Sequence, residues 1–326
     1  MEKYSFKILM TIIIFLSVPN IIFSQSRNEF PEFENVKKVA QTGYQFLKIG
    51  SGARSAAMGG AVVTLEGDAS TVFYNPAGLT SIQGNSVFVG YTNWFADMKH
   101  QALSAAFNLG SYGFLGINAV NLDNGVIKGT RISNSNLGYE DTGNLNVTEM
   151  AIGLTYAQRF TNSFGAGITV KYCEQDLIAQ KSSVLAFDIG TLYNTGWNDV
   201  KVAVSVQHFS KEIKYIDENF VLPLTFRVGF SGDVLQMANL DSKQHKLVLA
   251  LEGVNPRDYS ERVHVGSEYW YNNFLAIRGG YKFNYDVESF SFGVGLKHKG
   301  FQFDYSYSDF GSILGMVDRF SLVVNF

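Results

Sequence analysis

The ten residues Phe164-Gly165-Ala166-Gly167-Ile168-Thr169-Val170-Lys171-Tyr172-Cys173 alternate strictly in character. One set of alternate positions holds Phe164, Ala166, Ile168, Val170 and Tyr172, and the other holds Gly165, Gly167, Thr169, Lys171 and Cys173. Because successive side chains of a strand point to opposite faces, this period of two predicts a β-strand with one apolar face and one small or polar face.

The same alternation recurs over 289–298 and 301–308, and no helix-period stripe is sustained from Ser86 onward. We therefore predict an all-β antiparallel chain of about fourteen strands. They lie near 86–91, 102–109, 112–121, 148–158, 164–174, 183–194, 200–210, 224–231, 246–254, 262–271, 274–281, 289–298, 301–308 and 318–326. Tight connections at Gly110-Ser111 and Asn272-Asn273 alternate with long ones at 122–147, 211–223 and 232–245. Short turns on one side, long loops on the other and an even strand number are typical of bacterial outer-membrane barrels.

A soluble β-sandwich would alternate as well, so the distribution of residue types over the faces decides between the two. Aromatic residues gather near strand ends, as in the girdles of membrane barrels: Tyr91, Trp94, Phe95, Tyr193, Trp197, Tyr269, Trp270, Tyr271, Tyr305 and Tyr307. Charges of both signs lie opposite the apolar faces, where a hydrated lumen lets them pair: Lys171, Asp188, Lys201, Arg227, Glu252, Arg262, Glu268, Arg278, Lys297 and Asp304. Both distributions favour a transmembrane barrel, with outer-membrane lipid around it.

Composition excludes several classes of protein. Of the 326 residues, 46% are hydrophobic and 17% are charged, against roughly a quarter charged in a soluble domain. The net charge of −3 gives no support to a nucleic-acid partner, which would need a basic face. The single Cys173 excludes an internal disulfide framework and a cysteine-based zinc cluster.

The first residues have the layout of a secretory signal peptide. Lys3 and Lys7 precede an apolar run, which Pro19 and Asn20 interrupt before the small residue Ser24. We predict a signal peptide over residues 1–24 with cleavage near Ser24 or Gln25, and an exported chain. The alternative is an N-terminal membrane anchor, for which the run is short and interrupted.

The last predicted strand ends on an aromatic residue at the carboxyl terminus. Phe320, Leu322, Val324 and Phe326 alternate with more polar positions. An amphipathic final strand with a terminal aromatic residue is what outer-membrane assembly machinery typically reads, so we predict Phe326 to be the barrel assembly signal.

Residues 43–80 read differently, because small residues dominate them and allow close backbone packing. Asp68 can cap a short helix over 69–74. Pro76 pushes Asn75 out of the helical region, and Gly78 permits a tight turn through positive φ. We predict that residues 26–80 lie partly inside the barrel.

At this stretch the chain resembles the PorV/PorQ family, within the FadL-like outer-membrane barrels. The residues that carry the resemblance run from Gly52 through Arg54, Gly59 and Gly60 to Ala61, followed by Asp68 and by Asn75-Pro76-Ala77-Gly78-Leu79. The resemblance implies a fourteen-stranded barrel with an N-terminal hatch over 25–85, followed by the barrel over 86–326. The hatch motif would comprise Arg54, Gly59, Gly60, Asp68, Asn75, Pro76, Ala77 and Gly78.

The resemblance also implies a function in the type IX secretion system and a location in the cell outer membrane. PorV-type members receive cargo from the translocon and bind its C-terminal signal domain, while PorQ-type members belong to the surface attachment machinery. The translocon and cargo C-terminal domains are therefore the implied partners. The alternative is a FadL-like passive channel for hydrophobic small molecules, which would need an apolar pocket and a lateral opening in the wall.

No enzymatic site stands out in the sequence. The five histidines fall at no metal-ligand spacing, 229–233 lacks a nucleophile elbow, and the glycine-rich stretch 50–60 has no phosphate-binding lysine. We predict no turnover chemistry, no metal and no cofactor. The candidate partner contacts are the long connections 122–147, 211–223 and 232–245, because binding residues concentrate in loops on rigid scaffolds.

Overall fold

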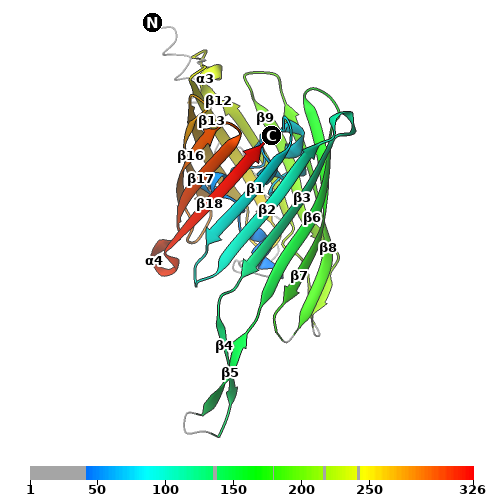
Figure 1. Cartoon of the computed structure of the whole chain (residues 1–326), viewed down its shortest axis with the longest axis vertical. Coiled ribbons are helices and arrows are strands. Elements are labelled where there is room, and N and C mark those ends of the chain that lie inside the picture. The colour runs from blue at the N-terminus through cyan, green and yellow to red at the C-terminus, as the bar shows by residue number, and fades with distance from the viewer. Residues whose placement is uncertain (1–41, 135–137, 179, 216–217, 241–242) are drawn as a thin grey trace, which may run out of the picture.

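A computed structural model describes residues 42–134, 138–178, 180–215, 218–240 and 243–326. The chain forms a closed barrel of fourteen antiparallel strands, as the sequence predicts (Figure 1). The barrel strands are β1(Ser86–Asn93), β2(Lys99–Asn108), β3(Phe114–Asp123), β6(Thr148–Arg159), β7(Phe164–Asp176), β8(Lys181–Asn194), β9(Lys201–Ser210), β12(Thr225–Asp233), β13(His245–Pro256), β14(Arg262–Tyr271), β15(Leu275–Phe283), β16(Phe290–His298), β17(Phe301–Asp309) and β18(Met316–Asn325). Each pairs with its neighbour in chain order, and β18 closes the barrel on β1.

The burial of β7 shows which way its two faces point. Thr169 and Lys171 are buried, whereas Ile168, Val170 and Tyr172 are about 40% exposed. The polar face therefore looks into the lumen and the apolar face looks outward. This arrangement is the reverse of a soluble sandwich, and it is the one that suits lipid around the barrel.

Connections gather at two ends that we call the turn end and the loop end. The turn end carries the carboxyl terminus and the connections 109–113, 160–163, 195–200, 234–244, 272–274 and 299–300. The loop end carries 94–98, 124–147, 177–180, 211–224, 257–261, 284–289 and 310–315. In Figure 1 the turn end is at the top and the loop end is at the bottom.

The sequence-based prediction that connection 232–245 lies on the same side of the barrel as 122–147 and 211–223 is wrong. Connection 234–244, which includes α3(Val234–Met237), follows the eighth barrel strand. Successive barrel strands run in opposite directions. Counted along the barrel rather than by label, the second, fourth, sixth and eighth strands (β2, β6, β8 and β12) therefore all return the chain to the turn end. Connections 124–147 and 211–224 follow the third and seventh barrel strands, β3 and β9, and lie together at the loop end.

The two longest loop-end connections contain hairpins that the alternation of residue types does not predict. β4(Ile127–Ile132) pairs with β5(Tyr139–Leu145), and β10(Ile213–Tyr215) pairs with β11(Glu218–Phe220). The β4–β5 hairpin projects well beyond the barrel rim (Figure 1). Its strands are short and almost fully exposed, so they lack the apolar face by which barrel strands are found in the sequence. Two short elements complete the rims, η5(Gly110–Tyr112) at the turn end and α4(Gly311–Leu314) at the loop end.

Residues 42–85, which we call the inner segment, run through the lumen from the loop end to the turn end. Their elements are η2(Gln45–Lys48), α2(Ala53–Ala57), η3(Ala69–Phe73) and η4(Pro76–Ser81). At the loop end the Thr42 hydroxyl donates to Asp258, and the Gly43 N–H donates to the Val221 carbonyl. Further on, α2 packs on β15 to β18, and η4 packs on β6, β7 and β8.

The carboxyl terminus closes the turn end. The Phe326 N–H donates to the Asn85 carbonyl at 3.0 Å, and the Asn85 N–H donates to the Phe326 carbonyl at 2.8 Å. Phe326 is 69% exposed. The predicted signal peptide and the rival anchor lie outside the described residues. Within the described ranges, no helix is long and apolar enough to cross a membrane.

Candidate functional site: the lumen and its inner segment

Wall glycines form the surface on which the inner segment lies. A Cβ added at Gly280 of β15 would come within 2.0 Å of the Gly59 nitrogen, and one at Gly190 of β8 would come within 1.9 Å of the Asn75 Oδ1. At Gly167 of β7 the nearest atom would be the Pro76 carbonyl carbon, at 2.7 Å. Lumen-facing glycines thus let the inner segment lie against the wall backbone, and larger residues there would displace it.

Gly59 and Gly60 need to be glycine for two reasons. Both adopt positive φ, +61° and +76°, which suits glycine far better than other residues. A Cβ at Gly59 would also meet the Tyr281 nitrogen at 2.7 Å. The turn brings the Gly59 N–H to the Ser291 hydroxyl at 3.1 Å, and the Gly60 carbonyl lies 3.0 Å from His264 Nδ1.

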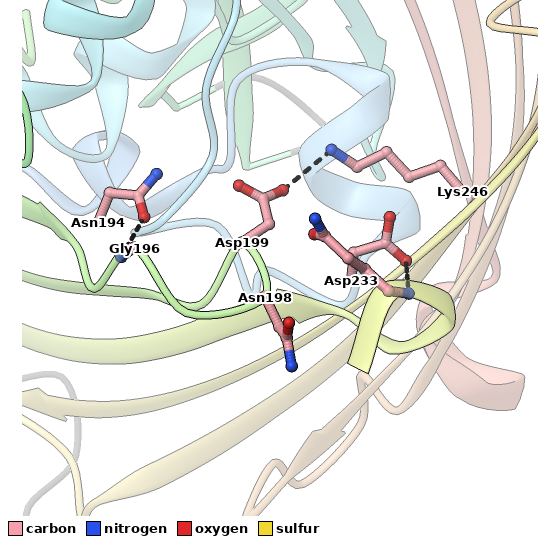
Figure 2. A pocket seen from close by; sticks show the side chains of 7 residues that line it. Asn194, Gly196, Asn198, Asp199, Asp233 and Lys246 are labelled. Atoms are coloured by element: carbon pink, nitrogen blue, oxygen red, sulfur yellow. Dashed lines mark hydrogen bonds and ion pairs between the residues drawn. The ribbon is translucent and has the colours of Figure 1, made fainter. Parts of the chain in front are cut away.

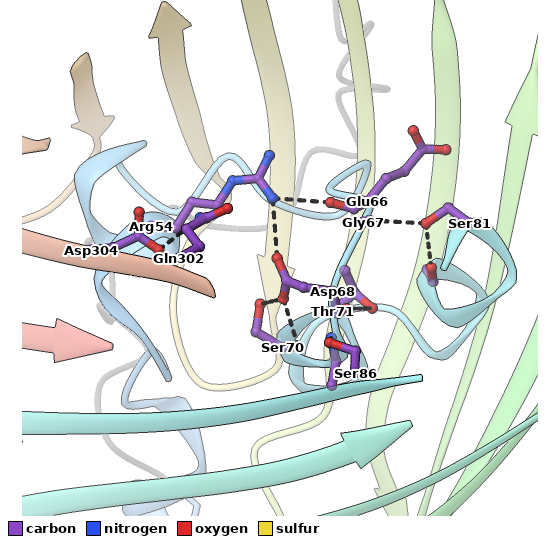
Figure 3. Close-up of polar contacts among 12 residues, drawn as sticks. Arg54, Glu66, Gly67, Asp68, Ser70, Thr71, Ser81, Ser86, Gln302 and Asp304 are labelled. Atoms are coloured by element: carbon purple, nitrogen blue, oxygen red, sulfur yellow. Dashed lines mark hydrogen bonds and ion pairs between the residues drawn. The ribbon is translucent and has the colours of Figure 1, made fainter. Parts of the chain in front are cut away.

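Arg54 joins the inner segment to the wall. Its guanidinium makes two hydrogen bonds of 2.8 Å to the Glu268 carboxylate on β14. Figure 3 shows its other contacts, in which Nη1 donates to the Glu66 carbonyl and to Asp68. Burial by itself lowers the pKa of a guanidinium, but Glu268 and then Asp68 raise the pKa of Arg54 above its usual value. Arg54 is therefore a permanent cation in a bidentate ion pair.

Asp68 caps the short helix that the sequence predicts after it. Its Oδ1 accepts from the Ser70 N–H at 2.8 Å and from the Ser70 hydroxyl, while Oδ2 accepts from Arg54 (Figure 3). The helix that follows, η3, is of the 3₁₀ type and ends at Phe73. Asp68 thus links the start of η3 to the ion pair of Arg54.

Asn75 is extended, at φ −152° and ψ 110°, as expected before a proline. Its side chain makes three hydrogen bonds: Oδ1 accepts from the Ala77 N–H, and Nδ2 donates to the carbonyls of Val63 and Thr191. Thr191 belongs to β8, so Asn75 also binds the wall. Ala77 is fully buried, next to Gly167.

The reason predicted for Gly78 is wrong. It lies within η4 and is not among the residues with positive φ. A Cβ there would instead come within 2.6 Å of the Thr71 Cβ. Close packing of η4 on η3, rather than an unusual backbone angle, therefore favours glycine.

Two carboxylates that hold the inner segment were not singled out as site residues in the sequence. Glu252 of β13 accepts from the N–H groups of Val62 and Val63, at 2.6 and 2.7 Å. Asp258, in connection 257–261, accepts from Thr42, Gln45 and Lys48. Burial raises the pKa of Asp258, but the hydrogen bonds from Lys48, Gln45 and Thr42 outweigh it and leave that pKa below its usual value. These contacts join segments far apart in the chain, so no local sequence motif predicts them.

Most charges predicted to face the lumen pair with one another or with the inner segment. Ion pairs join Lys171 to Asp188, Arg227 to Glu252, Arg278 to Glu268 and Asp304, and Lys201 to Glu66 and Asp199. Arg262 lies over the rings of Tyr259 and Tyr285, and Lys297 lies over Trp270. The lumen is thus a network of buried polar contacts around the inner segment.

A hollow of about 450 Å³ opens at the turn end (Figure 2). Polar residues dominate its lining: Asn194, Gly196, Asn198, Asp199, Asp233, Gln236 and Lys246. Lys246 donates to Asp199 at 3.1 Å across it. In the described ranges, no group of three or more His, Cys, Asp or Glu side chains is placed to hold a metal ion.

The fold resembles those of solved outer-membrane proteins. The toluene transporter TodX of Pseudomonas putida superposes with a TM-score of 0.58 at 13% identity, covering 84% of this chain and 97% of that one. The toluene transporter TbuX of Ralstonia pickettii gives 0.56 at 14% identity, with the same coverage, 84% and 97%. A Pseudomonas aeruginosa FadL homologue gives 0.52 at 11% identity, covering 89% and 100%. At these identities the likeness concerns the fold alone.

Sequence comparison identifies the family. No curated protein matches the chain at a significant level. Residues 69–312, three quarters of the chain, match the family described as "Type IX secretion system membrane protein PorP/SprF". The family and the barrel together locate the protein in the outer membrane and associate it with type IX secretion. The chain belongs to the PorP/SprF family of type IX secretion system membrane proteins.

Proposed function

We propose that the protein is a non-enzymatic, partner-binding component of the type IX secretion apparatus. In this proposal residues 1–24 are removed on export, residues 25–85 form a hatch, and residues 86–326 form the membrane barrel. The predicted motif residues, from Arg54 to Gly78, hold the hatch in place.

One observation carries the proposal: the inner segment is fixed to strands all around the lumen. Arg54 binds Glu268 on β14, Val62 and Val63 bind Glu252 on β13, and Asn75 binds β8. A lumen held by so many buried hydrogen bonds is a rigid scaffold rather than an open conduit. We therefore infer that partners bind to surfaces outside the lumen.

The loop end offers the surface with the greatest reach. Outer-membrane barrels carry their longer loops on the extracellular side, so the β4–β5 hairpin would stand out from the cell surface. Ile132 is 97% exposed near its tip. An isolated two-stranded hairpin is marginally stable in water, which supports a partner that orders it.

The proposal also covers which part of the secretion apparatus the protein serves. The residues around Arg54 and Asn75 resemble the PorV/PorQ family, whereas the family that matches is PorP/SprF. We infer a role beside the translocon or in surface attachment, with the translocon or the C-terminal domains of cargo as the partners. The diffusion-channel alternative is supported by the fold shared with the toluene transporters. It needs an apolar pocket, whereas the turn-end hollow is polar.

The test is to replace 127–145 by a short Gly-Ser linker in the native chromosome. We expect the barrel to assemble normally, seen as an unchanged heat-dependent gel shift, and the secreted surface proteins to stay inside the cell. The control exchanges Arg131 and Glu140, which pair with each other on the hairpin, and should secrete normally. A full deletion strain that secretes its surface proteins but grows poorly on a hydrophobic carbon source would refute the proposal in favour of diffusion.

A further inference from the structure

The β4–β5 hairpin is a small sheet with two open edges. Within the described residues this sheet holds only these two strands, and it stands beyond the barrel rim (Figure 1). A sheet edge presents a row of N–H and C=O groups that can pair with another chain. Because two strands alone are marginally stable in water, a third strand at either edge would stabilise the hairpin.

The backbone of β4 turns alternate residues toward its open edge. The Ser133 N–H donates to the Gly138 carbonyl at 3.2 Å, so the backbone groups of Ser133 point across the hairpin. Neighbouring residues of a strand point their N–H and C=O groups to opposite sides, so those of Arg131 also face β5. Three exposed residues of β4 consequently turn these groups to the open edge: Lys128, Thr130 and Ile132.

The open edge of β4 is regular, whereas that of β5 is interrupted. The register shifts between Gly129 and Thr130, so Thr142 of β5 has no register partner in β4. Beside it Gly143 has a φ of +92°, and its N–H donates to the Asp141 side chain at 2.8 Å. A bulge bends its strand, disrupts the ladder and protects an edge from pairing. β4 is therefore the edge that can take a continuous third strand.

The side chains of β4 favour a strand that is acidic and partly apolar. β4 carries Lys128 and Arg131 and no acidic residue. Arg131 pairs with Glu140 of β5, whereas Lys128 is exposed and makes no ion pair within the described residues. On the same face as Lys128, Ile132 is 97% exposed and lies opposite Tyr139. An acidic residue beside Lys128 and an apolar residue beside Ile132 would complement both as cross-strand pairs.

We propose that β4 binds an extended acidic segment of a secretion partner, which adds to it as a third, antiparallel strand through the backbone of Lys128, Thr130 and Ile132. The inference rests on the proposed partner-binding function and names how the partner is held. The segment matches the six residues of β4, with an apolar residue beside Ile132 and an acidic one beside Lys128, four positions apart. Backbone hydrogen bonds give strand addition its affinity, and alternate side chains give its specificity. A second copy of β4 fits less well, because it brings two more cations and no acid.

The direct test measures amide hydrogen exchange of the purified full chain in detergent, with a synthetic peptide as the probe. The probe carries a phenylalanine and, four positions later, a glutamate, with threonine and valine elsewhere; the control probe has lysine in place of the glutamate. We expect the glutamate probe alone to slow exchange of the Thr130 and Ile132 N–H groups. Equal slowing by the two probes, or none by either, would overturn the proposal. Slow exchange there without any probe, in a protein that runs as a dimer, would assign the edge to a second copy instead.

A test in the cell uses Thr130→Pro. Proline removes the N–H that faces the open edge, and it is tolerated in edge strands where that N–H faces solvent. We expect the secreted surface proteins to stay inside the cell, whereas Thr130→Val, which keeps the N–H, should secrete normally. If replacement of 127–145 blocks secretion but Thr130→Pro does not, strand addition is wrong and the proposed function stands. If replacement of 127–145 leaves secretion intact, the proposed role of the hairpin itself fails.

Lys128→Glu is the second variant, should proline unfold the hairpin. Because Lys128 is exposed and makes no ion pair within the described residues, its replacement leaves the contacts between β4 and β5 in place. We expect the variant to lose protection by the glutamate probe, to gain protection by the lysine probe, and to lose secretion. Lys214→Glu, at an exposed lysine of β10 in the other loop-end hairpin, should behave as the wild type. An unchanged preference for the glutamate probe in Lys128→Glu would contradict the pairing proposed for Lys128.

Discussion

Gly280→Ala tests whether the inner segment is packed on the wall as the structure has it. The added Cβ would lie 2.0 Å from the Gly59 nitrogen and 2.3 Å from the Met58 carbonyl carbon. Both neighbours are backbone atoms, and Gly59 holds a positive φ, so neither can move aside by changing a rotamer. The inner segment must shift or detach.

The matched control is Gly279→Ala, one residue earlier on the same strand and on its other face. There the nearest atom to a Cβ is the Ser267 hydroxyl at 3.8 Å, an ordinary contact. Removing a strand glycine should gain about 0.5–1 kcal/mol in either variant. Overpacking of a buried site costs typically 1–3 kcal/mol, and a clash with fixed backbone belongs at the upper end. We expect Gly280→Ala to be less stable than Gly279→Ala by about 3 kcal/mol.

Two measurements check this expectation. Urea unfolding in lipid vesicles, followed by tryptophan fluorescence, gives the difference in the free energy of unfolding. Trypsin cleavage after Arg54 reports detachment of the inner segment even where the barrel survives. We expect cleavage in Gly280→Ala and protection in Gly279→Ala. Equal free energies of unfolding and equal resistance to trypsin in the two variants would show that the inner segment is not packed on β15.

Three further predictions concern the ends of the barrel and the hatch motif. Deleting Phe326 should sharply reduce the amount of protein assembled in the outer membrane, because its backbone closes β18 on Asn85; normal levels of the truncated protein would contradict this. Asn75→Ala removes three hydrogen bonds and should cost about 3 kcal/mol of stability at about 1 kcal/mol each, measured by urea unfolding. If stability were unchanged while cargo or ligand binding was lost, Asn75 would be a ligand contact instead. The lowered pKa of Asp258 means that its contribution is complete above the unfolded value near pH 4 and is lost as pH falls through the folded value. The thermal midpoint should therefore fall on acidification below about pH 4, and this loss should be smaller in Asp258→Asn.

The barrel itself could be predicted from the sequence because each strand carries its own signal. In 164–173 the alternation of apolar with small or polar residues defines both the strand and its two faces. The structure places a strand at each of the fourteen predicted positions. The β4–β5 hairpin escaped prediction because strands exposed on both faces need no alternation.

The hatch motif could be predicted in part. The capping role of Asp68 and the extended Asn75 follow from local chemistry, and both are confirmed. The reason for Gly78 was wrong because its constraint comes from Thr71, across a contact between two helices. Glu252 and Asp258 were missed as anchors because hydrogen bonds across the lumen leave no spacing in the sequence.

The sequence by itself determined the barrel strands, their faces and their number, since these depend on hydrophobic periodicity and on turn residues that act within a few positions. Only the tertiary structure decided what the lumen-facing glycines are for. On a strand such as β7, Gly165 and Gly167 read simply as small residues on the polar face. Closure of the barrel brings Thr80 and Pro76 against them, within 2.5 and 2.7 Å of where a Cβ would lie. Their need to be glycine arises from segments more than eighty residues away, and such a contact exists only once the chain has closed on itself.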